Sequence, residues 1–230
     1  MGTSKPKQND KELVVDLVLE FVEAALHEYL FAWNVYPSEA FELRTIYELP
    51  VHMCRHPQLC DYIHTMLVGC RDWLLRGELD KLHVPVLSAL GHPIDSLVIE
   101  TAWVHDATHT DEPLPLSHLE DEFRAALVAL AAAPFARAKG TSGEPEPAAQ
   151  SFRILAHTVE GAPRPGTAVD QRHLANSWVL ADSHWSSVMD GEELNDLFPV
   201  RSIASEQLPV RVLLYMERRH GDDHEEETKS

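Results

Sequence analysis

The segment from Lys11 to Trp33 constrains the fold most, because it has helical spacing and is apolar around most of its circumference. Its polar residues form one narrow stripe, which consists of Asp16, Glu20, Glu23 and His27. The apolar residues on the remaining arc are Val14, Val15, Val18, Leu19, Phe21, Val22, Ala25, Leu26, Tyr29, Leu30 and Trp33. A helix with so wide an apolar arc is buried on more than one side. We therefore predict a central helix whose polar stripe faces solvent.

The remaining elements are read from spacing and from turn residues. A second helix is predicted from Pro57 to Gly77, since proline suits a first helical turn and glycine commonly follows the last. A third helix begins near Ser117 and ends before Pro134. Strands are predicted at residues 49–53, 82–90, 95–105, 151–160 and 208–219. Pro85 cannot donate to a ladder, so its strand is at an edge there or carries a bulge. This order predicts an α+β fold, with helices packed on an antiparallel sheet.

Three segments differ from the rest in composition. Residues 1–9 and the acidic residues 220–230 are predicted to be disordered, and the Gly/Pro/Ser-rich residues 136–150 to be a flexible loop. What remains is one domain, residues 10–219. Residues 167–208 within it show weak periodicity, yet the stretch 165–215 contains the large apolar side chains Trp178, Leu180, Trp185, Leu197, Phe198 and Tyr215. Aromatic residues of this kind favour an interface with a partner.

The charge balance excludes several function classes. The chain has 37 acidic and 19 basic residues and a net charge of −18, which opposes direct binding to nucleic acid. Its apolar runs are shorter than the roughly 18 residues that a membrane span needs, and residues 1–8 lack the apolar core of a signal peptide. Its three cysteines cannot all pair. We expect a cytosolic or nuclear protein with reduced thiols and no membrane partner.

Two groups of residues are weighed as chemical sites. The stretch 51–64 contains His52, Cys54, His56, Cys60 and His64. Their spacing matches no paired zinc module, and each has an ordinary structural explanation, so no metal is predicted. Asp182, Ser183 and His184 are adjacent and cannot converge as a triad does. The chain also lacks a G-x-S-x-G elbow, a P-loop and a G-x-G-x-x-G motif. No catalytic residues and no cofactor are predicted, and we expect a protein that is not an enzyme.

Five blocks in one order carry a family resemblance over residues 11–219. They are FVEAALHEYLFAWNVYPSEAF, YELPVHMCRHPQLCDYI, LSHLEDEFRA, WVLAD and LLYMERR. Together they resemble the HORMA-domain family, in particular its non-catalytic accessory subunit of translesion DNA polymerase zeta. The resemblance implies a HORMA fold, in which three helices pack on an antiparallel sheet and a C-terminal safety belt, here residues 165–215, closes over a bound peptide. The peptide adds a strand to the sheet.

The resemblance also implies roles for individual residues. Tyr62 and Trp178 match residues that pack on a proline-containing peptide of the polymerase zeta catalytic subunit, and Tyr36 and Leu180 would line the same channel. The residues at the surface that docks the C-terminal domain of the Y-family deoxycytidyl transferase are Leu197, Leu213 and Tyr215. The family has glutamine where this chain has Leu213. Arg124 matches an arginine of the HORMA–HORMA dimer surface.

The resemblance thus implies a nuclear adaptor for translesion synthesis and the DNA-damage response. Other HORMA protomers, shieldin-type proteins and an AAA+ remodelling ATPase are further partners that it allows. Some blocks, such as VYPSEAF and RDWLL, are closer to the spindle-checkpoint HORMA protein. That alternative implies binding to peptides of the anaphase activator and of the checkpoint scaffold.

Overall fold

The computed structural model describes residues 6–104, 116–138, 151–162, 178, 181, 196–205 and 208–218, with side chains from residue 10 onward and up to residue 133 in the third helix. Its elements in chain order are α1 (Pro6–Ala32), the short 3-10 helix η1 (Ser38–Ala40), β1 (Phe41–Ile46), β2 (Leu49–Cys54), α2 (Pro57–Arg76), β3 (Leu79–Leu87), β4 (Pro93–Trp103), α3 (Leu116–Ala138), β5 (Ser151–Phe152), β6 (Leu155–Thr158), β7 (Asp196–Ile203) and β8 (Val210–Arg218). No described helix is long and apolar enough to cross a membrane.

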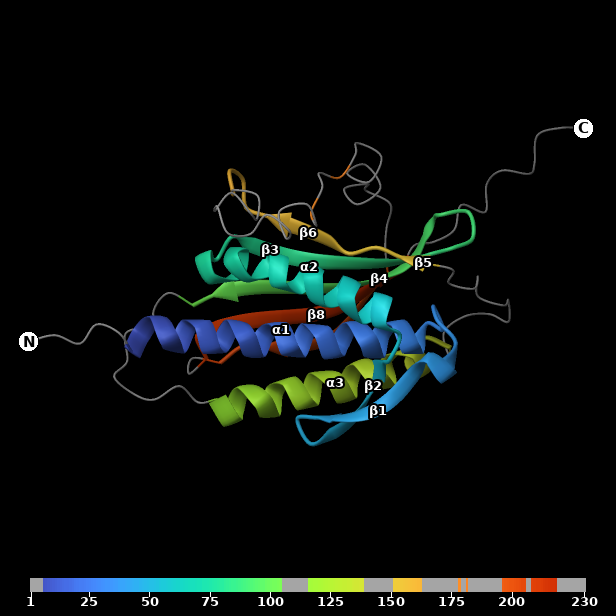
Figure 1. Ribbon diagram of the computed structural model, residues 1–230, viewed down its shortest axis with the longest axis horizontal. Coiled ribbons are helices and arrows are strands. Elements are labelled where there is room, and N and C mark those ends of the chain that lie inside the picture. Colours follow the sequence, from blue (N-terminus) through green and yellow to red (C-terminus); the bar gives the residue numbers. More distant parts are fainter. Residues whose placement is uncertain are drawn as a thin grey trace, which may run out of the picture.

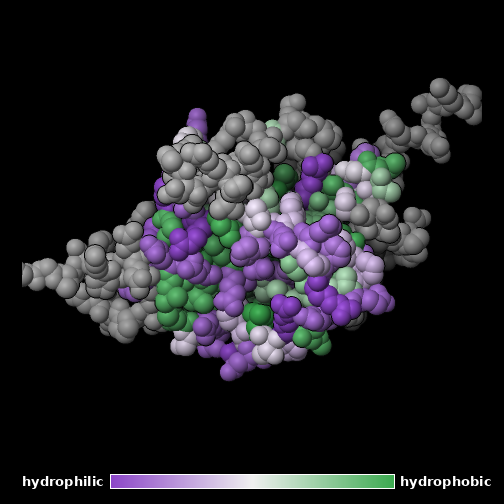
Figure 2. Space-filling model, viewed as in Figure 1, coloured by the Kyte–Doolittle hydropathy of each residue, from purple (hydrophilic) through white to green (hydrophobic). Residues whose placement is uncertain are grey.

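The main sheet is antiparallel throughout and has the strand order β5/β6, β3, β4, β8, β7. The three helices lie together against this sheet, and β1 and β2 form a separate hairpin beside α1 and α3 (Figure 1). On the face seen in Figure 2, hydrophobic residues occur in small groups separated by hydrophilic ones. The predicted fold class, three helices packed on an antiparallel sheet, is confirmed.

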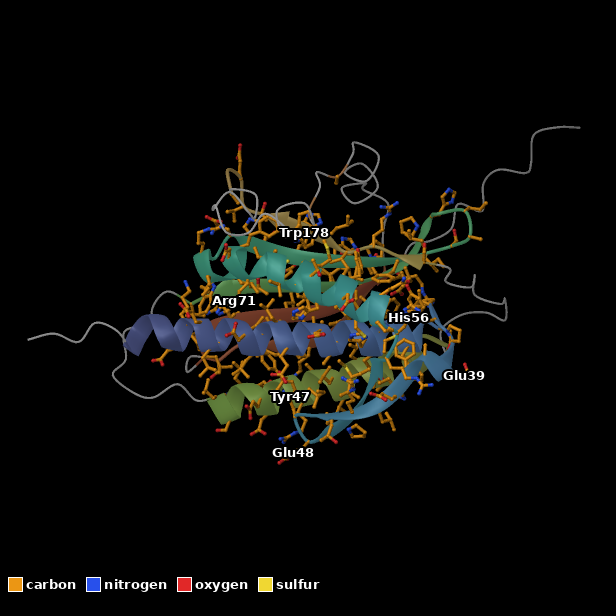
Figure 3. The ribbon with its side chains drawn as sticks, viewed as in Figure 1. Glu39, Tyr47, Glu48, His56, Arg71 and Trp178 are labelled. Carbon is orange, nitrogen blue, oxygen red and sulfur yellow. The ribbon has the colours of Figure 1, made fainter. Side chains whose placement is uncertain are left out.

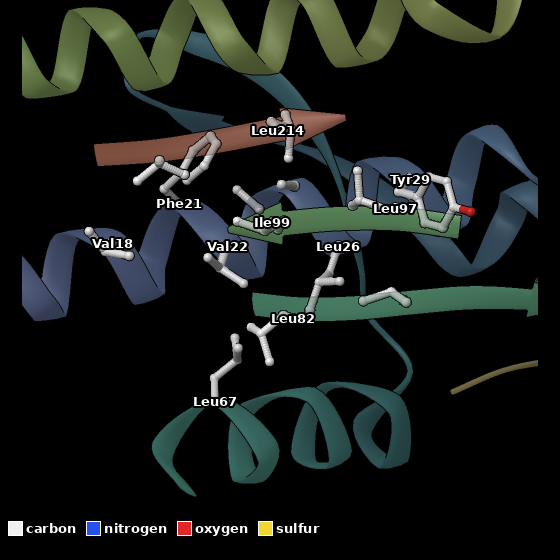
Figure 4. Close-up of a cluster of buried hydrophobic side chains, with 14 of the residues drawn as sticks. Val18, Phe21, Val22, Leu26, Tyr29, Leu67, Leu82, Leu97, Ile99 and Leu214 are labelled. Carbon is white, nitrogen blue, oxygen red and sulfur yellow. The ribbon is translucent and has the colours of Figure 1, made fainter. Parts of the chain in front are cut away.

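The core surrounds α1, which packs between α2, α3 and the sheet (Figure 4). Phe21 of α1 is fully buried and stacks on Phe123 of α3, with ring centroids 4.4 Å apart. Leu26 and Leu30 are also fully buried, and burial of each such side chain contributes roughly 1.5–3 kcal/mol. The prediction of a central helix is therefore correct.

The predicted solvent-facing stripe of α1 is wrong at one position. Asp16 is exposed and pairs with Arg71 of α2 at 2.9 Å, and Glu20 is exposed. His27, however, is only 1% exposed, because the hairpin β1–β2 folds back over this part of the helix. There Nδ1 of His27 accepts the backbone N–H of Cys54 at 3.3 Å.

Several boundaries also differ from those expected. Helix α1 begins at Pro6, within the segment expected to be disordered, and α3 continues past Pro134 to Ala138. The strand expected at 151–160 is divided into β5 and β6. Strands β1 and β7 were not predicted. Residues 1–5, 139–150 and 219–230 lie outside the described residues.

Pro85 shows how β3 accommodates a proline inside a sheet. It pairs with Ser96 of β4, and its carbonyl accepts the N–H of Arg153 at 3.1 Å. Because the N–H and C=O of one residue point to the same side of a strand, the missing N–H faces the break between β5 and β6. The β3–β4 register also shifts just after this point, between Val86 and Leu87. The proline thus lies where the ladder is already interrupted.

Candidate peptide-binding edge

Strands β5 and β6 form one edge of the main sheet. β6 pairs with β3 on one side, and within the described residues no strand pairs with its other side. The C-terminal strands are far from this edge, since β8 pairs with β4 and β7 lies outside β8. An open edge presents backbone N–H and C=O groups that can pair with an added strand. The β6 edge is therefore geometrically suited to extended peptides.

Two of the predicted peptide-binding residues converge beside this edge. Tyr36 follows α1 and Tyr62 is on α2, and both meet Phe152 of β5 edge to face, at centroid distances of 6.5 Å and 5.8 Å. Tyr62 remains 41% exposed. Phe152 was not predicted as a site residue, because its short strand contains no motif that distinguishes it from a core residue. The three rings form an aromatic cluster of Tyr36, Tyr62 and Phe152 with accessible surface.

The electrostatics of this cluster keep its hydroxyl groups neutral. Burial raises the pKa of Tyr62, while the charge of Arg153 and a hydrogen bond from the Ile154 backbone partly oppose that rise. Burial also raises the pKa of Tyr36, with a smaller contribution from Cys54. Since tyrosine normally titrates near pH 10, both side chains are O–H donors at neutral pH. They can donate to a peptide carbonyl.

Trp178 is not part of α2, but its side chain packs against this helix beyond Tyr62. In Figure 3 it lies on the side of the helix where β6 runs. Its ring packs edge to face on Trp73 at a centroid distance of 5.7 Å and covers Gly69. Gly69 and Tyr62 are seven residues apart, which is about 10 Å along a helix. The structure thus places Tyr62 and Trp178 along one helix rather than in contact. Leu180, the fourth predicted residue, lies outside the described residues, as does most of the predicted belt.

The predicted second surface lies on the opposite part of the sheet. Leu197 of β7 pairs with Glu217 of β8, and alternation along β8 places Leu213, Tyr215 and Glu217 on the face away from the helices. Leu197 is 61% and Leu213 38% exposed. The hydroxyl of Tyr215 donates to Glu100 at 2.7 Å, and burial, followed by this carboxylate, raises the pKa of Tyr215. The three residues predicted from the resemblance therefore share one face.

Arg124 is engaged within the chain. Its Nε donates to the carbonyl of Tyr47 at 2.7 Å, and its terminal nitrogens contact Asp121 at 2.9 Å and Glu48 at 3.2 Å. Tyr47 and Glu48 form the β1–β2 turn and both have positive φ, at 48° and 61°. Non-glycine residues rarely adopt that conformation. Arg124 thus supports a strained turn, a role that the sequence did not suggest.

The side chains of the histidine- and cysteine-rich stretch make local contacts. Cys60 donates through Sγ to the carbonyl of Cys54 at 3.0 Å, and the His56 N–H donates to Sγ of Cys54 at 3.3 Å. Burial raises the pKa of Cys60, so its thiol stays protonated. His64 is exposed. Among the described residues, no three His, Cys, Asp or Glu side chains lie close enough to hold a metal ion.

Comparison with known proteins shows what the chain is similar to. No family model matches the chain. The mitotic spindle assembly checkpoint protein MAD2B of Danio rerio is 28% identical over 215 residues, 92% of this chain and 93% of that protein. The DNA polymerase zeta processivity subunit of Arabidopsis thaliana is 28% identical over 97 residues, 42% of this chain and 45% of that protein.

Solved structures show the same fold. A chain of the mitotic checkpoint complex has a TM-score of 0.65 at 18% identity, with 90% of this chain and 99% of that chain covered. C. elegans HTP-2 bound to the HIM-3 closure motif has a TM-score of 0.62 at 12% identity, with 91% of each chain covered.

The fold and these relatives indicate the class: the chain has the fold of HORMA-domain proteins and resembles HORMA adaptors. Within that class it resembles MAD2B and the accessory subunit of DNA polymerase zeta. The resemblance carried by the five sequence blocks is thereby confirmed.

Proposed function

We propose that the chain is a non-enzymatic, nuclear adaptor that binds a proline-containing peptide of the polymerase zeta catalytic subunit as an added strand on β6. The observation that carries this proposal is the open β6 edge next to the aromatic cluster. A peptide strand satisfies its backbone groups on such an edge and places alternate side chains in pockets. Proline lacks an N–H, so it fits where its nitrogen points away from β6.

In this proposal different residues contact different parts of the peptide. Tyr62 and Tyr36 contact one part of the peptide, and Trp178 contacts another about two helical turns away along α2. Leu180 lines the same channel, and residues 165–215 fold over the bound strand as a safety belt. Closure of a belt over a ligand slows its release, so affinity differences should appear mainly in the dissociation rate.

A second site makes the protein a bridge. We assign docking of the C-terminal domain of the Y-family deoxycytidyl transferase to the surface of Leu197, Leu213 and Tyr215. This surface is separated from β6 by β3 and β4. Adjacent strands lie about 4.8 Å apart, so the peptide on β6 and the domain on β7 and β8 would occupy separate parts of the sheet. In this proposal both partners therefore bind at once. Contacts with another HORMA protomer through Arg124, with shieldin-type proteins and with an AAA+ ATPase belong to the same proposal. Arg124 would first have to leave the β1–β2 turn.

The experiment is a dissociation measurement with an immobilised peptide that carries two prolines a few residues apart. The unmodified chain should bind, and the Tyr62→Ala, Trp178→Ala double variant should release the peptide much faster. His64→Ala is the matched control, because His64 is exposed on the same helix. Equal dissociation from all three proteins would refute the channel assignment.

A checkpoint function is the second candidate. It is favoured by the structural likeness to a chain of the mitotic checkpoint complex and by the spindle-checkpoint name of the MAD2B relatives. It predicts preference for peptides of the anaphase activator and of the checkpoint scaffold. Binding to those peptides and to the polymerase peptide, measured side by side, separates the two candidates.

A further inference from the structure

Trp178 lies in a notch on α2 that exists because residue 69 is glycine. A Cβ added at Gly69 would lie 2.5 Å from Nε1 and 2.9 Å from Cδ1 of Trp178, closer than real Cβ contacts. One turn further along the helix, Trp73 meets the Trp178 ring at an interplanar angle of 61°. We call this the Gly69–Trp73 notch; Figure 3 shows Trp178 beside α2.

The glycine has no conformational reason to be in this helix. Gly69 lies in the middle of α2, is buried, and does not adopt a positive φ. Glycine in a helix interior is less favourable than alanine. The Trp178 ring occupies the space that a Cβ at position 69 would need. The close approach of this ring therefore explains why residue 69 is glycine although glycine weakens the helix.

Shape holds the ring in the notch more than polar contact does. Nε1 of Trp178 is buried and finds no hydrogen-bond acceptor among the described residues. Trp178 packs against the apolar core yet is only partly buried. The ring therefore contacts α2, while the residue as a whole keeps partial exposure.

We propose that Gly69 is a positioning residue, which fixes the Trp178 ring on α2 before any peptide arrives. Resting on the proposed function, this means that the peptide meets an aromatic surface that is already ordered. Peptide binding then costs less conformational entropy, because the Trp178 side chain is already ordered before the peptide binds. Trp73 forms the second wall of the notch and limits the orientation of the ring.

Four proteins test the notch without any peptide: the unmodified chain, Gly69→Ala, Trp178→Ala and the double variant. With Trp178 absent, alanine at position 69 should raise Tm by about 2–4 °C, because it favours the helix. With Trp178 present, the same substitution should lower Tm. An equal shift in both backgrounds would overturn the proposal. If Gly69→Ala does not fold, folding of the double variant supports the notch, and failure of both contradicts it.

Peptide dissociation is the second readout. Gly69→Ala should release the proline-containing peptide about as fast as Trp178→Ala does, roughly tenfold faster than the unmodified chain, whereas His64→Ala should not. If Tm shows the coupling but the unmodified chain binds no peptide, the notch stands and the proposed function fails. If Tm shows no coupling, the notch fails whatever the peptide does.

Discussion

The buried histidine of α1 makes a quantitative prediction about acid stability. His27 is 1% exposed, and burial, followed by the charge of Arg44, lowers its pKa from 6.5 to about 4. The unfolded chain therefore binds a proton at this residue over a pH range in which the folded chain does not. Titration of His27 therefore does not change the free energy of unfolding well above pH 6.5. It lowers that free energy as the pH drops from 6.5 to about 4.

The magnitude follows from the difference in pKa. A shift of about 2.5 units at about 1.36 kcal/mol per unit gives roughly 3 kcal/mol lost below pH 4. About 2 kcal/mol of this is already lost at pH 5. That is a substantial part of the 5–15 kcal/mol typical of whole domains.

The comparison variant is His27→Asn, whose amide oxygen can accept the Cys54 N–H in place of Nδ1. Asparagine does not titrate, and the cavity left by its smaller side chain costs the same at every pH. Urea unfolding is measured for both proteins from pH 7.5 to pH 4.5. The difference in unfolding free energy should be constant above pH 7 and shift by about 2 kcal/mol in favour of the variant at pH 5.

Parallel stability curves for the two proteins would refute the reasoning. Since other titrating groups are shared, they cancel in the difference. His64→Asn, at an exposed position of α2, controls for the loss of a histidine as such and should follow the unmodified chain.

Three further predictions concern packing and surface. Phe21→Ala should destabilise the chain by about 3–5 kcal/mol in urea unfolding, because it removes a fully buried ring stacked on Phe123. Arg124→Leu should cost about 1–2 kcal/mol and speed hydrogen exchange in β1 and β2, since the Tyr47 carbonyl loses its donor; exchange no faster than in the unmodified chain would contradict this role. Leu197→Asp should change stability by less than about 0.5 kcal/mol while it abolishes binding of the transferase domain, because Leu197 is 61% exposed.

Elements with strong local patterns could be predicted from the sequence. Helix α2 has proline in its first turn and is followed by Gly77 in the left-handed conformation. The hairpin β3–β4 has a Gly-His-Pro turn between its strands. Strand β1 could not be predicted, because it is almost entirely exposed and so lacks apolar alternation. Strand β7 contains Pro199 and a register shift next to it, and it is defined by pairing with β8 rather than by its own pattern.

The candidate site could be outlined from the sequence only in part, for a related reason. The resemblance implies roles for Tyr36, Tyr62 and Trp178, and these stay predictions. It gives no role to Phe152, which contacts both Tyr36 and Tyr62 although it is distant from them in the chain. Nor does a sequence show that a glycine in a helix faces a particular ring. His27 was assigned to solvent because helical spacing describes one helix, whereas its burial results from a hairpin that arrives later in the chain.

The position of β8 between β4 and β7 has a consequence for biosynthesis. Residues 95–103 pair with residues 210–218, so β4 has no neighbour on that side until the residues of β8, roughly 100 positions further along the chain, have been synthesised. Contacts this distant in sequence form slowly, and an unpaired apolar strand in a nascent chain invites aggregation. Chaperone demand should therefore persist until β8 is available, and nonsense mutations just before β8 should yield insoluble rather than partly active product.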